Sequence, residues 1–284
     1  MIRPGLPGGV ATLGWAALAL VVGMALVRPL IPFDGWLYHL PFAAKLWDLP
    51  GAAAFGMEAQ AVERWAGYPR AWHWLMGLAW WATDSLRAVI VPQLVLVGLF
   101  LAYLRRAHGI APPLMALGLL ASPMLLIHVQ ATYLDLPAGL CLALGFLVLL
   151  DMLAAARGPD GTVRRASAAL AIAAIGLAGN IKYQGTLGAF LVLAIAGGMA
   201  AVMSRIAARR RLALLAVMAA AGLAASLSLV GNAIRYGQPL YPMDVKLLGL
   251  TVSAGPESPE EDANPPAYLL AGSQLVRLPG PWNC

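Results

Sequence analysis

The chain has 284 residues, of which 61% are hydrophobic and only 11% are charged. Water-soluble domains carry about 25% charged residues, so this composition excludes an ordinary soluble fold. The net charge of +6 at pH 7 would suggest a nucleic-acid partner in a soluble protein. Here the basic residues stand in short tracts between apolar runs, where they indicate membrane topology, so we expect membrane lipids and no nucleic acid as partners. The two cysteines, Cys141 and Cys284, provide neither a disulfide framework nor a metal cluster.

Seven apolar runs approach or reach the roughly 17–25 residues that a helix needs to cross a bilayer. In chain order they cover residues 10–27, 86–104, 112–128, 137–153, 165–180, 186–204 and 212–230. The first run ends in Arg28-Pro29 without a small-residue cleavage site, so we interpret it as a retained helix rather than a signal peptide. The sequence thus predicts an all-α, polytopic membrane protein with about seven transmembrane helices.

The distribution of arginine decides which stretches cross. Residues 71–83 (AWHWLMGLAWWAT) cover only roughly 20 Å as a helix, less than the hydrocarbon core of about 30 Å, and they are rich in tryptophan, which favours membrane interfaces. If this stretch stays in the outer interface, nine arginines fall in the cytoplasmic loops after the second, fourth and sixth runs. If it crosses, all nine lie outside, against the positive-inside rule. We therefore place this stretch in the outer interface and the amino terminus in the cytoplasm.

This topology leaves a long first outer loop at residues 28–85, which carries juxtamembrane helices at 35–47 and 71–83. We expect the membrane to be a bacterial plasma membrane, with the active site on its outer side. Residues 1–250 make up one transmembrane module. Residues 251–284 turn polar (ESPEEDANPP), and we interpret them as the start of a missing or truncated region.

Two carboxylates stand where a predicted spanning helix meets the outer surface: Asp34 in IPFDGWLYHLP and Asp135 in ATYLDLPAGL. A carboxylate at that depth is costly unless it has a partner or a task. Together the two can hold a cation, or one can act as a base while the other positions a ligand. Each can equally be a helix cap, Asp34 before a helix at Gly35 and Asp135 before a helix with Pro137 in its first turn. Both interpretations stay open at this point.

Positive charge is disfavoured on the outer side, so Lys182 in AGNIKYQG and Arg235 in GNAIRYGQPLYP each need an explanation. They can form a cradle for an anionic headgroup such as a lipid phosphate, or they can extend toward ordinary lipid phosphates. Glu63 and Tyr68, in AVERWAGYPR, lie between helices of the first loop and can either line a site or be ordinary loop residues.

Three histidines, His39, His73 and His128, also fall on the outer side. No two of them have the i, i+4 spacing of a helical metal pair. Taken one at a time, each is interpreted as structural.

Five motifs, in this order and on this side, resemble the GT-C superfamily of membrane glycosyltransferases, which includes protein O-mannosyltransferases, aminoarabinose transferases and oligosaccharyltransferases. The motifs are FDGWLYHLP, YPRAWHWLMGL, SPMLLIHVQATYLDLP, NIKYQG and GN-x-x-RYG-x-P-x-YP. The resemblance covers nearly all of residues 10–245.

The resemblance implies transfer of a sugar from a polyprenyl-phosphate donor to a lipid, glycan or protein acceptor on the outer face, with inversion at the anomeric carbon. It implies that Asp34 is the catalytic base and that Asp135 is the acidic residue of the second outer loop. Lys182 and Arg235 would bind the phosphate, and a Mg²⁺ or Mn²⁺ ion, if used, would be held by the two aspartates. The remaining substrate-binding candidates are Tyr38, His39, Glu63, Tyr68, Tyr183 and Tyr236.

Two other classes of protein compete with an enzyme. A transporter of lipids or small molecules usually shows internal repeats and charges at the bilayer midplane, whereas here the charges gather at the outer ends and no repeat is visible. A non-catalytic scaffold or lipid-binding fragment of a glycosyltransferase remains open, because such a protein would keep the same helices.

Overall fold

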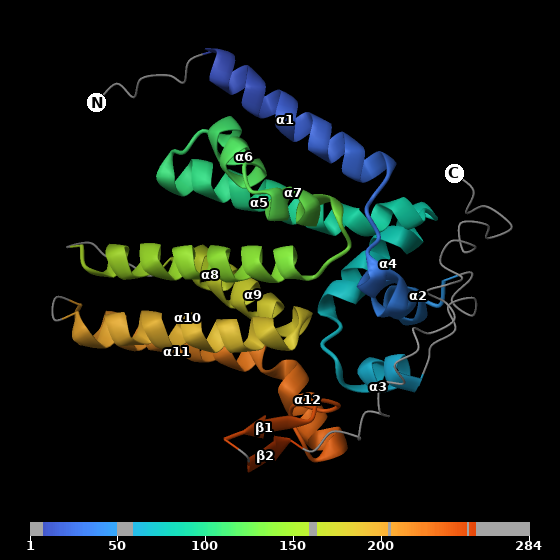
Figure 1. The fold of residues 1–284 in the computed structure, drawn as a ribbon. Helices are drawn as coiled ribbons and strands as arrows, with labels where there is room; N and C mark the ends of the chain where they lie inside the picture. Colours follow the sequence, from blue (N-terminus) through green and yellow to red (C-terminus); the bar gives the residue numbers. More distant parts are fainter. Residues whose placement is uncertain (1–7, 50–58, 159–163, 204–205, 249, 254–284) are drawn as a thin grey trace, which may run out of the picture.

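A computed structural model describes residues 8–49, 59–158, 164–203, 206–248 and 250–253 (Figure 1). The part of the chain that it describes is almost entirely helical, in agreement with the all-α prediction. The α-helices are α1 (Gly8–Val27), α2 (Leu40–Leu46), α3 (Ala59–Gly67), α4 (Ala71–Thr83), α5 (Val91–His108), α6 (Pro112–Leu120), α7 (Pro123–Gln130), α8 (Asp135–Ala156), α9 (Arg165–Ile181), α10 (Tyr183–Val202), α11 (Ala208–Ala225) and α12 (Leu227–Tyr236).

Three smaller elements complete the described fold. A π-helical turn, η1 (Gly35–His39), leads into α2, and a 3-10 turn, η3 (Leu86–Ile90), leads into α5. An antiparallel hairpin of β1 (Val245–Leu247) and β2 (Leu250–Ser253), which the sequence did not predict, follows α12. The predicted polar region from 254 to the end lies outside the described residues.

Among the described residues, four helices are long and apolar enough to cross a membrane: α1, the continuous η3–α5 segment, α8 and α10. The number rises to six if two bent pairs are each counted as one span, and α9, at 17 residues, is apolar but short. All seven predicted runs are helical. The protein is therefore a polytopic membrane protein, with four to six candidate spans in the described chain rather than an established seven.

The predicted span 112–128 is not one straight helix. It is divided into α6 and α7, which are bent by 102° relative to each other. The break falls at Ser122, whose extended backbone (φ −87°, ψ 115°) is the conformation that a following proline, here Pro123, imposes. A weaker bend of 48° separates α11 from α12 at Ser226, whose hydroxyl donates to the carbonyl of Gly222 at 2.6 Å.

The long helices present apolar side chains outward as well as inward. On α10, Leu187 is 71% exposed and Leu191 is 61% exposed, and α1 has a similar outer face. A water-soluble protein rarely exposes apolar patches of this extent, whereas lipid accepts them. The inner faces meet through small residues: a Cβ atom added to Gly179 of α9 would lie 2.4 Å from the carbonyl oxygen of Ala225 on α11. This close approach is typical of membrane helices.

The predicted helix at 71–83 is present as α4 with those bounds. It packs on α2 and η3, and its residues Trp72, Met76 and Trp80 are all buried. Its other face carries Trp74 and Trp81, which are 45% and 59% exposed. A helix with one buried face and one exposed face that carries tryptophans suits the membrane interface. That location stays a prediction.

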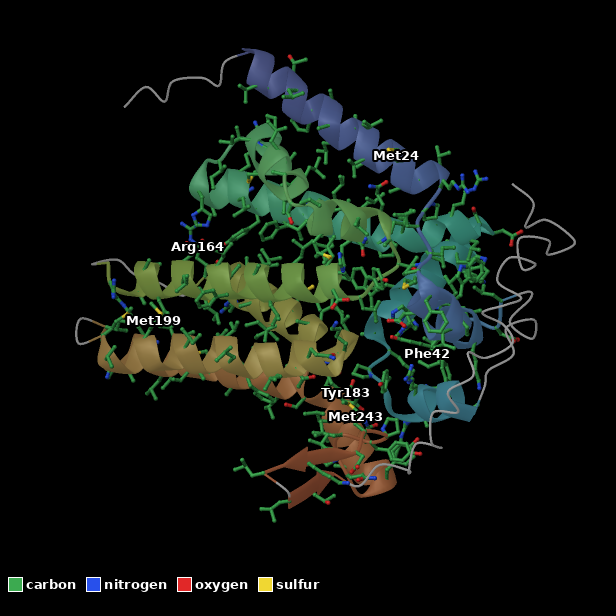
Figure 2. All side chains as sticks on the ribbon, in the orientation of Figure 1. Met24, Phe42, Arg164, Tyr183, Met199 and Met243 are labelled. Carbon is green, nitrogen blue, oxygen red and sulfur yellow. The ribbon has the colours of Figure 1, made fainter. Side chains whose placement is uncertain are left out.

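The bundle has two chemically different ends (Figure 2). Arg164 and Met199 lie at one end, and Phe42, Tyr183 and Met243 lie at the other. At the first end Arg210 donates to the carbonyl of Gly158 at 2.7 Å, so the arginine-rich loops after α8 and α10 are neighbours. Helices α2, α3 and α4 gather at the opposite end, where α8 and α10 begin (Figure 1). The loops that were predicted to share one side of the membrane therefore lie at one end of the bundle. Which end faces the cytoplasm stays a prediction.

Candidate functional site

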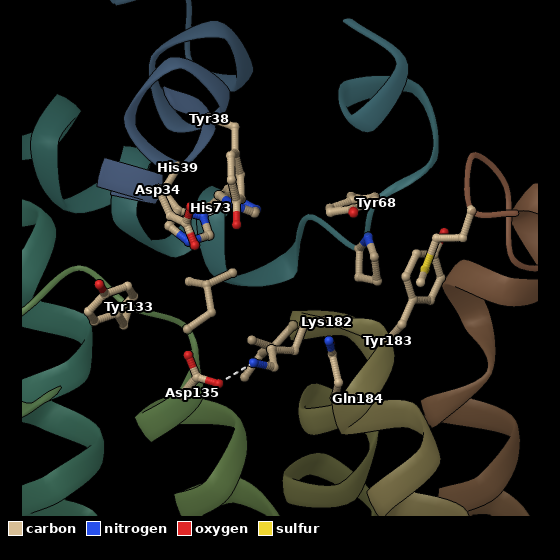
Figure 3. Close-up of a pocket in the computed structure, with 14 residues that line it drawn as sticks. Asp34, Tyr38, His39, Tyr68, His73, Tyr133, Asp135, Lys182, Tyr183 and Gln184 are labelled. Atoms are coloured by element: carbon tan, nitrogen blue, oxygen red, sulfur yellow. Dashed lines mark hydrogen bonds and ion pairs between the residues drawn. The ribbon is translucent and has the colours of Figure 1, made fainter. Parts of the chain in front are cut away.

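A cavity of about 200 Å³ lies at the end of the bundle where α2, α3 and α4 gather (Figure 3). It is enclosed by η1, by the loop between α3 and α4, by α4 itself and by the junctions α7–α8 and α9–α10. The residues that line it are Asp34, Tyr38, His39, Tyr68, Pro69, His73, Tyr133, Leu134, Asp135, Ile181, Lys182, Tyr183, Gln184 and Met243.

A backbone pairing brings the two aspartates to this cavity. The chain after α1 runs parallel to the chain before α8 and pairs with it at Leu30 and Ala131. The amide of Leu30 donates to the carbonyl of Gln130 at 2.8 Å. Asp34 comes four residues after Leu30, and Asp135 comes four residues after Ala131. Two carboxylates about a hundred residues apart in sequence therefore line one cavity.

Two further residues stabilise this junction. Gly35 lies against Thr132, and a Cβ atom on Gly35 would lie 2.5 Å from the Thr132 hydroxyl oxygen, so a larger residue would push η1 away. The buried amide of Gln93 on α5 donates to the carbonyls of His128 at 2.6 Å and Ala131 at 3.0 Å. Polar groups without water must be paired inside the protein, and this glutamine satisfies carbonyls that the end of α7 leaves free.

Neither aspartate makes a capping hydrogen bond with its side chain. Asp34 holds the N-cap position of η1, but its side chain makes no capping hydrogen bond. Asp135 is the first residue of α8 itself, with Leu134 at the N-cap position. The capping interpretation is therefore wrong for both side chains. The carboxylate of Asp135 still benefits from the positive end of the α8 dipole.

Lys182 is the single residue between α9 and α10. Its extended backbone (φ −161°, ψ 159°) separates the two helices, and its carbonyl accepts from the amide of Gly185 at 2.9 Å. The ammonium group forms an ion pair with Asp135, and the side chain is only 24% exposed. Lys182 therefore points into the cavity rather than outward to lipid phosphates (Figure 3).

Tyr38 connects the first carboxylate to a neighbouring arginine. The guanidinium of Arg64 lies 5.3 Å from the centre of its ring, and the negative charge of Asp34 acts on its hydroxyl. Burial raises the pKa of Tyr38 above its ordinary value of 10, and the negative charge of Asp34 raises it further. The phenol therefore stays protonated beside the Asp34 carboxylate.

A buried pair of histidines forms another wall. Nδ1 of His39 lies 2.9 Å from Nε2 of His73, and the two residues are 4% and 1% exposed. Burial lowers the pKa of His39 well below 6.5, with His73 and the positive charge of Lys182 adding to the effect. Burial, with the nearby charge of Arg70, lowers the pKa of His73 to about 3. The pair is therefore neutral, with one ring nitrogen donating to the other.

Tyr183 links the cavity to the segment after α11. Its hydroxyl lies 2.5 Å from the carbonyl of Tyr241 and accepts from the side-chain amide of Asn232 at 2.7 Å. The same amide nitrogen donates to the carbonyl of Gly67 at 2.8 Å. Asn232 was not among the predicted site residues, although it stands in the GN-x-x-RYG motif. The sequence feature that could have indicated Asn232 is its side-chain amide within an apolar helix, where an unpaired polar group is costly.

Of the predicted site residues, the cavity is lined by Asp34, Tyr38, His39, Tyr68, Asp135, Lys182 and Tyr183. Arg235 and Tyr236 do not line it. The Tyr236 hydroxyl donates to the carbonyl of Ala66 at 3.2 Å, and its ring stacks on Tyr241 at 4.0 Å. Glu63 belongs to α3, but its side chain lies outside the described part of the chain. His73, Tyr133 and Gln184 also line the cavity and were not among the predicted site residues, because spacing within the sequence gave no reason to select them.

A divalent cation would take Asp34 and Asp135 as ligands. Among the described residues, no three His, Cys, Asp or Glu side chains are grouped to hold a metal ion. The carboxylate of Asp135 is already paired with the ammonium of Lys182. Mg²⁺ can bind through one or two carboxylates and water, but with Asp135 paired to Lys182, Asp34 is the carboxylate of the described cavity lining that is left for an ion, so the fit is poor.

No protein-family model matches this chain, and no curated protein or solved structure matches it significantly. A functional assignment therefore depends on the motifs, the helices and the chemistry of the cavity.

Proposed function

We propose that this protein is a membrane glycosyltransferase of the GT-C type, which transfers a sugar from a polyprenyl-phosphate donor to an acceptor hydroxyl with inversion. The observation that carries the proposal is one cavity lined by Asp34 and by the Asp135–Lys182 ion pair, at the end of the bundle opposite the arginine-rich loops. With those loops in the cytoplasm, the cavity lies on the extracytoplasmic side.

The proposed reaction is a single displacement. Asp34 accepts the proton of the acceptor hydroxyl while the hydroxyl oxygen bonds to the anomeric carbon of the sugar. The bond between that carbon and the phosphate oxygen breaks, and the lipid phosphate leaves with the electron pair. Phosphate is a good leaving group, so the reaction needs a base and a positive charge rather than an acid. Attack from the side opposite the leaving group inverts the anomeric carbon.

The surroundings of each group support these roles. Among the described residues, Asp34 has no cationic partner, so its carboxylate is not neutralised, and the protonated phenol of Tyr38 lines the same cavity. Lys182 provides the positive charge for the leaving phosphate, and Asp135 holds the lysine in the cavity. The proposed reaction uses no metal, because Lys182 already provides a positive charge beside Asp135.

The size of the cavity limits what it receives. Sites for drug-sized ligands measure about 300–1,000 Å³. At about 200 Å³, this cavity has room for a sugar or a phosphate headgroup but not for a long carrier chain. In the proposed complex the polyprenyl chain lies against the apolar outer faces of the helices.

The proposal is tested with the purified protein in lipid nanodiscs and a radiolabelled polyprenyl-phosphate sugar. Asp34→Asn keeps the size of the side chain but removes its basicity, so transfer should fall by about 10²–10⁴-fold. Asp84→Asn is the matched control, because Asp84 is exposed at the end of α4 and does not line the cavity. Equal activity in the two variants would refute the assignment of Asp34. Donor binding without transfer by the unaltered protein would instead favour the lipid-binding scaffold.

A further inference from the structure

A cluster of hydrogen bonds beside the cavity joins three distant parts of the chain. At its centre is the side-chain amide of Asn232 in α12, a residue that is 6% exposed. The amide nitrogen lies 2.7 Å from the Tyr183 hydroxyl, 2.8 Å from the Gly67 carbonyl oxygen and 3.0 Å from the Tyr241 carbonyl oxygen. The Tyr183 hydroxyl lies 2.8 Å from the first of these carbonyl oxygens and 2.5 Å from the second. The two side chains of this Asn232–Tyr183 cluster therefore share the same two carbonyls.

The cluster has a donor for each of these acceptors. The amide of Asn232 carries two N–H groups, and the phenol of Tyr183 carries one O–H group. These three protons face the two carbonyls and the phenol oxygen. Removal of one donor leaves an acceptor short of a partner in a largely buried place, and an unpaired buried polar group is costly. The cluster therefore holds the Tyr183 side chain in one position.

Tyr183 is the first residue of α10 and directly follows Lys182 (Figure 3). Its hydroxyl is at the far end of the side chain, so fixing that group fixes the rotation of α10 about its own axis. The same turn is also tied to α9, because the Thr186 hydroxyl donates to the carbonyl of Gly179 at 2.7 Å. The direction in which the lysine side chain leaves the backbone therefore depends on the cluster.

The same cluster fixes another wall of the cavity. Met243, which lines the cavity, comes two residues after Tyr241, and its amide donates to the carbonyl of Leu240 at 2.8 Å in a turn. A Cβ atom added to Gly67 would lie 2.2 Å from the Tyr241 carbonyl oxygen, so this turn is in direct contact with the end of α3. Tyr183 and Met243 lie at the same end of the bundle (Figure 2). One set of hydrogen bonds therefore holds this wall and the lysine.

We propose that Asn232 and Tyr183 are positioning residues for Lys182, which set the direction in which the lysine presents its charge to the phosphate of the donor. This inference rests on the proposed function. Asp135 holds the ammonium group at one end of the lysine side chain, and the cluster holds the backbone at the other end. Asn232 does not line the cavity, and the Tyr183 hydroxyl is engaged by the cluster, so both act through the lysine.

The test measures two quantities with the full chain in nanodiscs of zwitterionic lipid: binding of undecaprenyl phosphate and the rate of sugar transfer at saturating donor. Tyr183→Phe keeps the ring and removes the hydroxyl, so both quantities should fall by about two- to tenfold. Asn232→Asp keeps the size of the side chain but turns an oxygen toward the two carbonyls, so the loss should be about tenfold or more. Tyr103→Phe is the matched control, because its hydroxyl donates to Asp151 at 2.5 Å at the opposite end of the bundle. It should change neither quantity.

The deciding measurement repeats these changes in a Lys182→Gln background. A positioning residue acts only through the lysine, so Tyr183→Phe and Asn232→Asp should add little further loss once the lysine charge is gone. A purely structural residue would cause the same fold-loss in both backgrounds, and that result would overturn the inference. An equal loss in the Tyr103→Phe control would overturn it as well. Tyr183→Phe leaves both N–H groups of Asn232 on the carbonyls, so this variant is expected to fold and keeps the test interpretable if Asn232→Asp does not.

Failure of this inference can be told apart from failure of the proposed function. Equal losses in both backgrounds, with sugar transfer that still depends on Asp34, would refute the positioning role and leave the glycosyltransferase proposal standing. Binding of undecaprenyl phosphate that shows the coupling to Lys182, without any sugar transfer, would refute the glycosyltransferase and leave the positioning role standing. An unaltered protein that neither binds undecaprenyl phosphate nor transfers sugar would refute both.

Discussion

Leu30 and Ala131 lie side by side in a parallel backbone pairing, and each stands four residues before an aspartate of the cavity. The pairing determines how closely η1 approaches the start of α8. Gly35 lies so close to Thr132 that a Cβ atom added to it would be 2.5 Å from the Thr132 hydroxyl oxygen. The geometry of the two carboxylates therefore depends on a residue that has no functional group.

Replacing Gly35 by alanine should damage both stability and sugar transfer. The new methyl group would lie 2.5 Å from the Thr132 hydroxyl oxygen, and such overpacking costs about 1–3 kcal/mol. Thermal unfolding in detergent and the transfer assay measure the two effects. Gly98→Ala on α5 is the control, because nothing lies within 4 Å of its added Cβ atom and alanine favours a helix. Thr132→Ala should partly rescue Gly35→Ala, and an absence of rescue would contradict this account.

Lys182→Gln should reduce sugar transfer by about 10²–10³-fold, because the leaving phosphate loses its preorganised positive charge. Asp135→Asn should reduce the rate of sugar transfer less than Lys182→Gln does, since it loosens the lysine side chain without removing the positive charge of the lysine. The initial rate at saturating donor and the KM for the donor separate the two effects. Lys246→Gln, which breaks the exposed pair with Asp244 on the β1–β2 hairpin, should leave both quantities unchanged. A normal rate in Lys182→Gln would exclude this lysine from the reaction.

Removal of divalent cations should leave sugar transfer essentially intact. Lys182 occupies the carboxylate of Asp135 that an ion would need, and the described residues group no three metal-binding side chains. Rates measured in EDTA and after adding back Mg²⁺ or Mn²⁺ check this expectation. A rate that collapses in EDTA and recovers with one of these ions would show that a metal takes the place assigned to the lysine.

Acidification should destabilise the protein through His39 and His73. Their pKa values are lowered in the folded protein, whereas the unfolded chain takes up protons near pH 6.5, so stability is present above that pH and falls below it. Each histidine contributes a slope of about 1.4 kcal/mol per pH unit in this range. Unfolding midpoints between pH 7.5 and pH 5 should show a smaller loss in His73→Gln than in the unaltered protein. His128→Gln, whose ring bonds locally to Met124, should keep the full slope.

Labelling of introduced cysteines in intact cells should reveal the orientation of the protein across the membrane. In a Cys284→Ser background, a cysteine at position 108 should be shielded from an impermeant reagent, and one at position 60 should react. The reason is the concentration of arginine in the loops at the end where α5 finishes. Labelling at 108 with none at 60 would invert the topology and move the cavity to the cytoplasmic side.

The sequence by itself determined the helices and their grouping. A backbone in lipid must satisfy its own hydrogen bonds, so long apolar runs become helices whatever their neighbours are. The bounds of α4, Ala71–Thr83, were predicted from the apolar run alone. The arginines indicated which loops lie on the same side of the membrane. Two of the predicted runs bend: 112–128 at Ser122, where Pro123 imposes an extended backbone, and 212–230 at Ser226.

Only the tertiary structure decided which polar groups meet. The pairs His39–His73 and Lys182–Asp135 join residues 34 and 47 positions apart, and no helical or strand period connects such positions. The placement of Arg235 was also decided by the tertiary structure. The resemblance assigned this arginine to phosphate binding, whereas the packing of α12 places it outside the cavity. Periodicity constrains contacts within an element. Contacts between elements depend on close approaches such as that of Gly35 to Thr132, which the packing of the whole bundle determines.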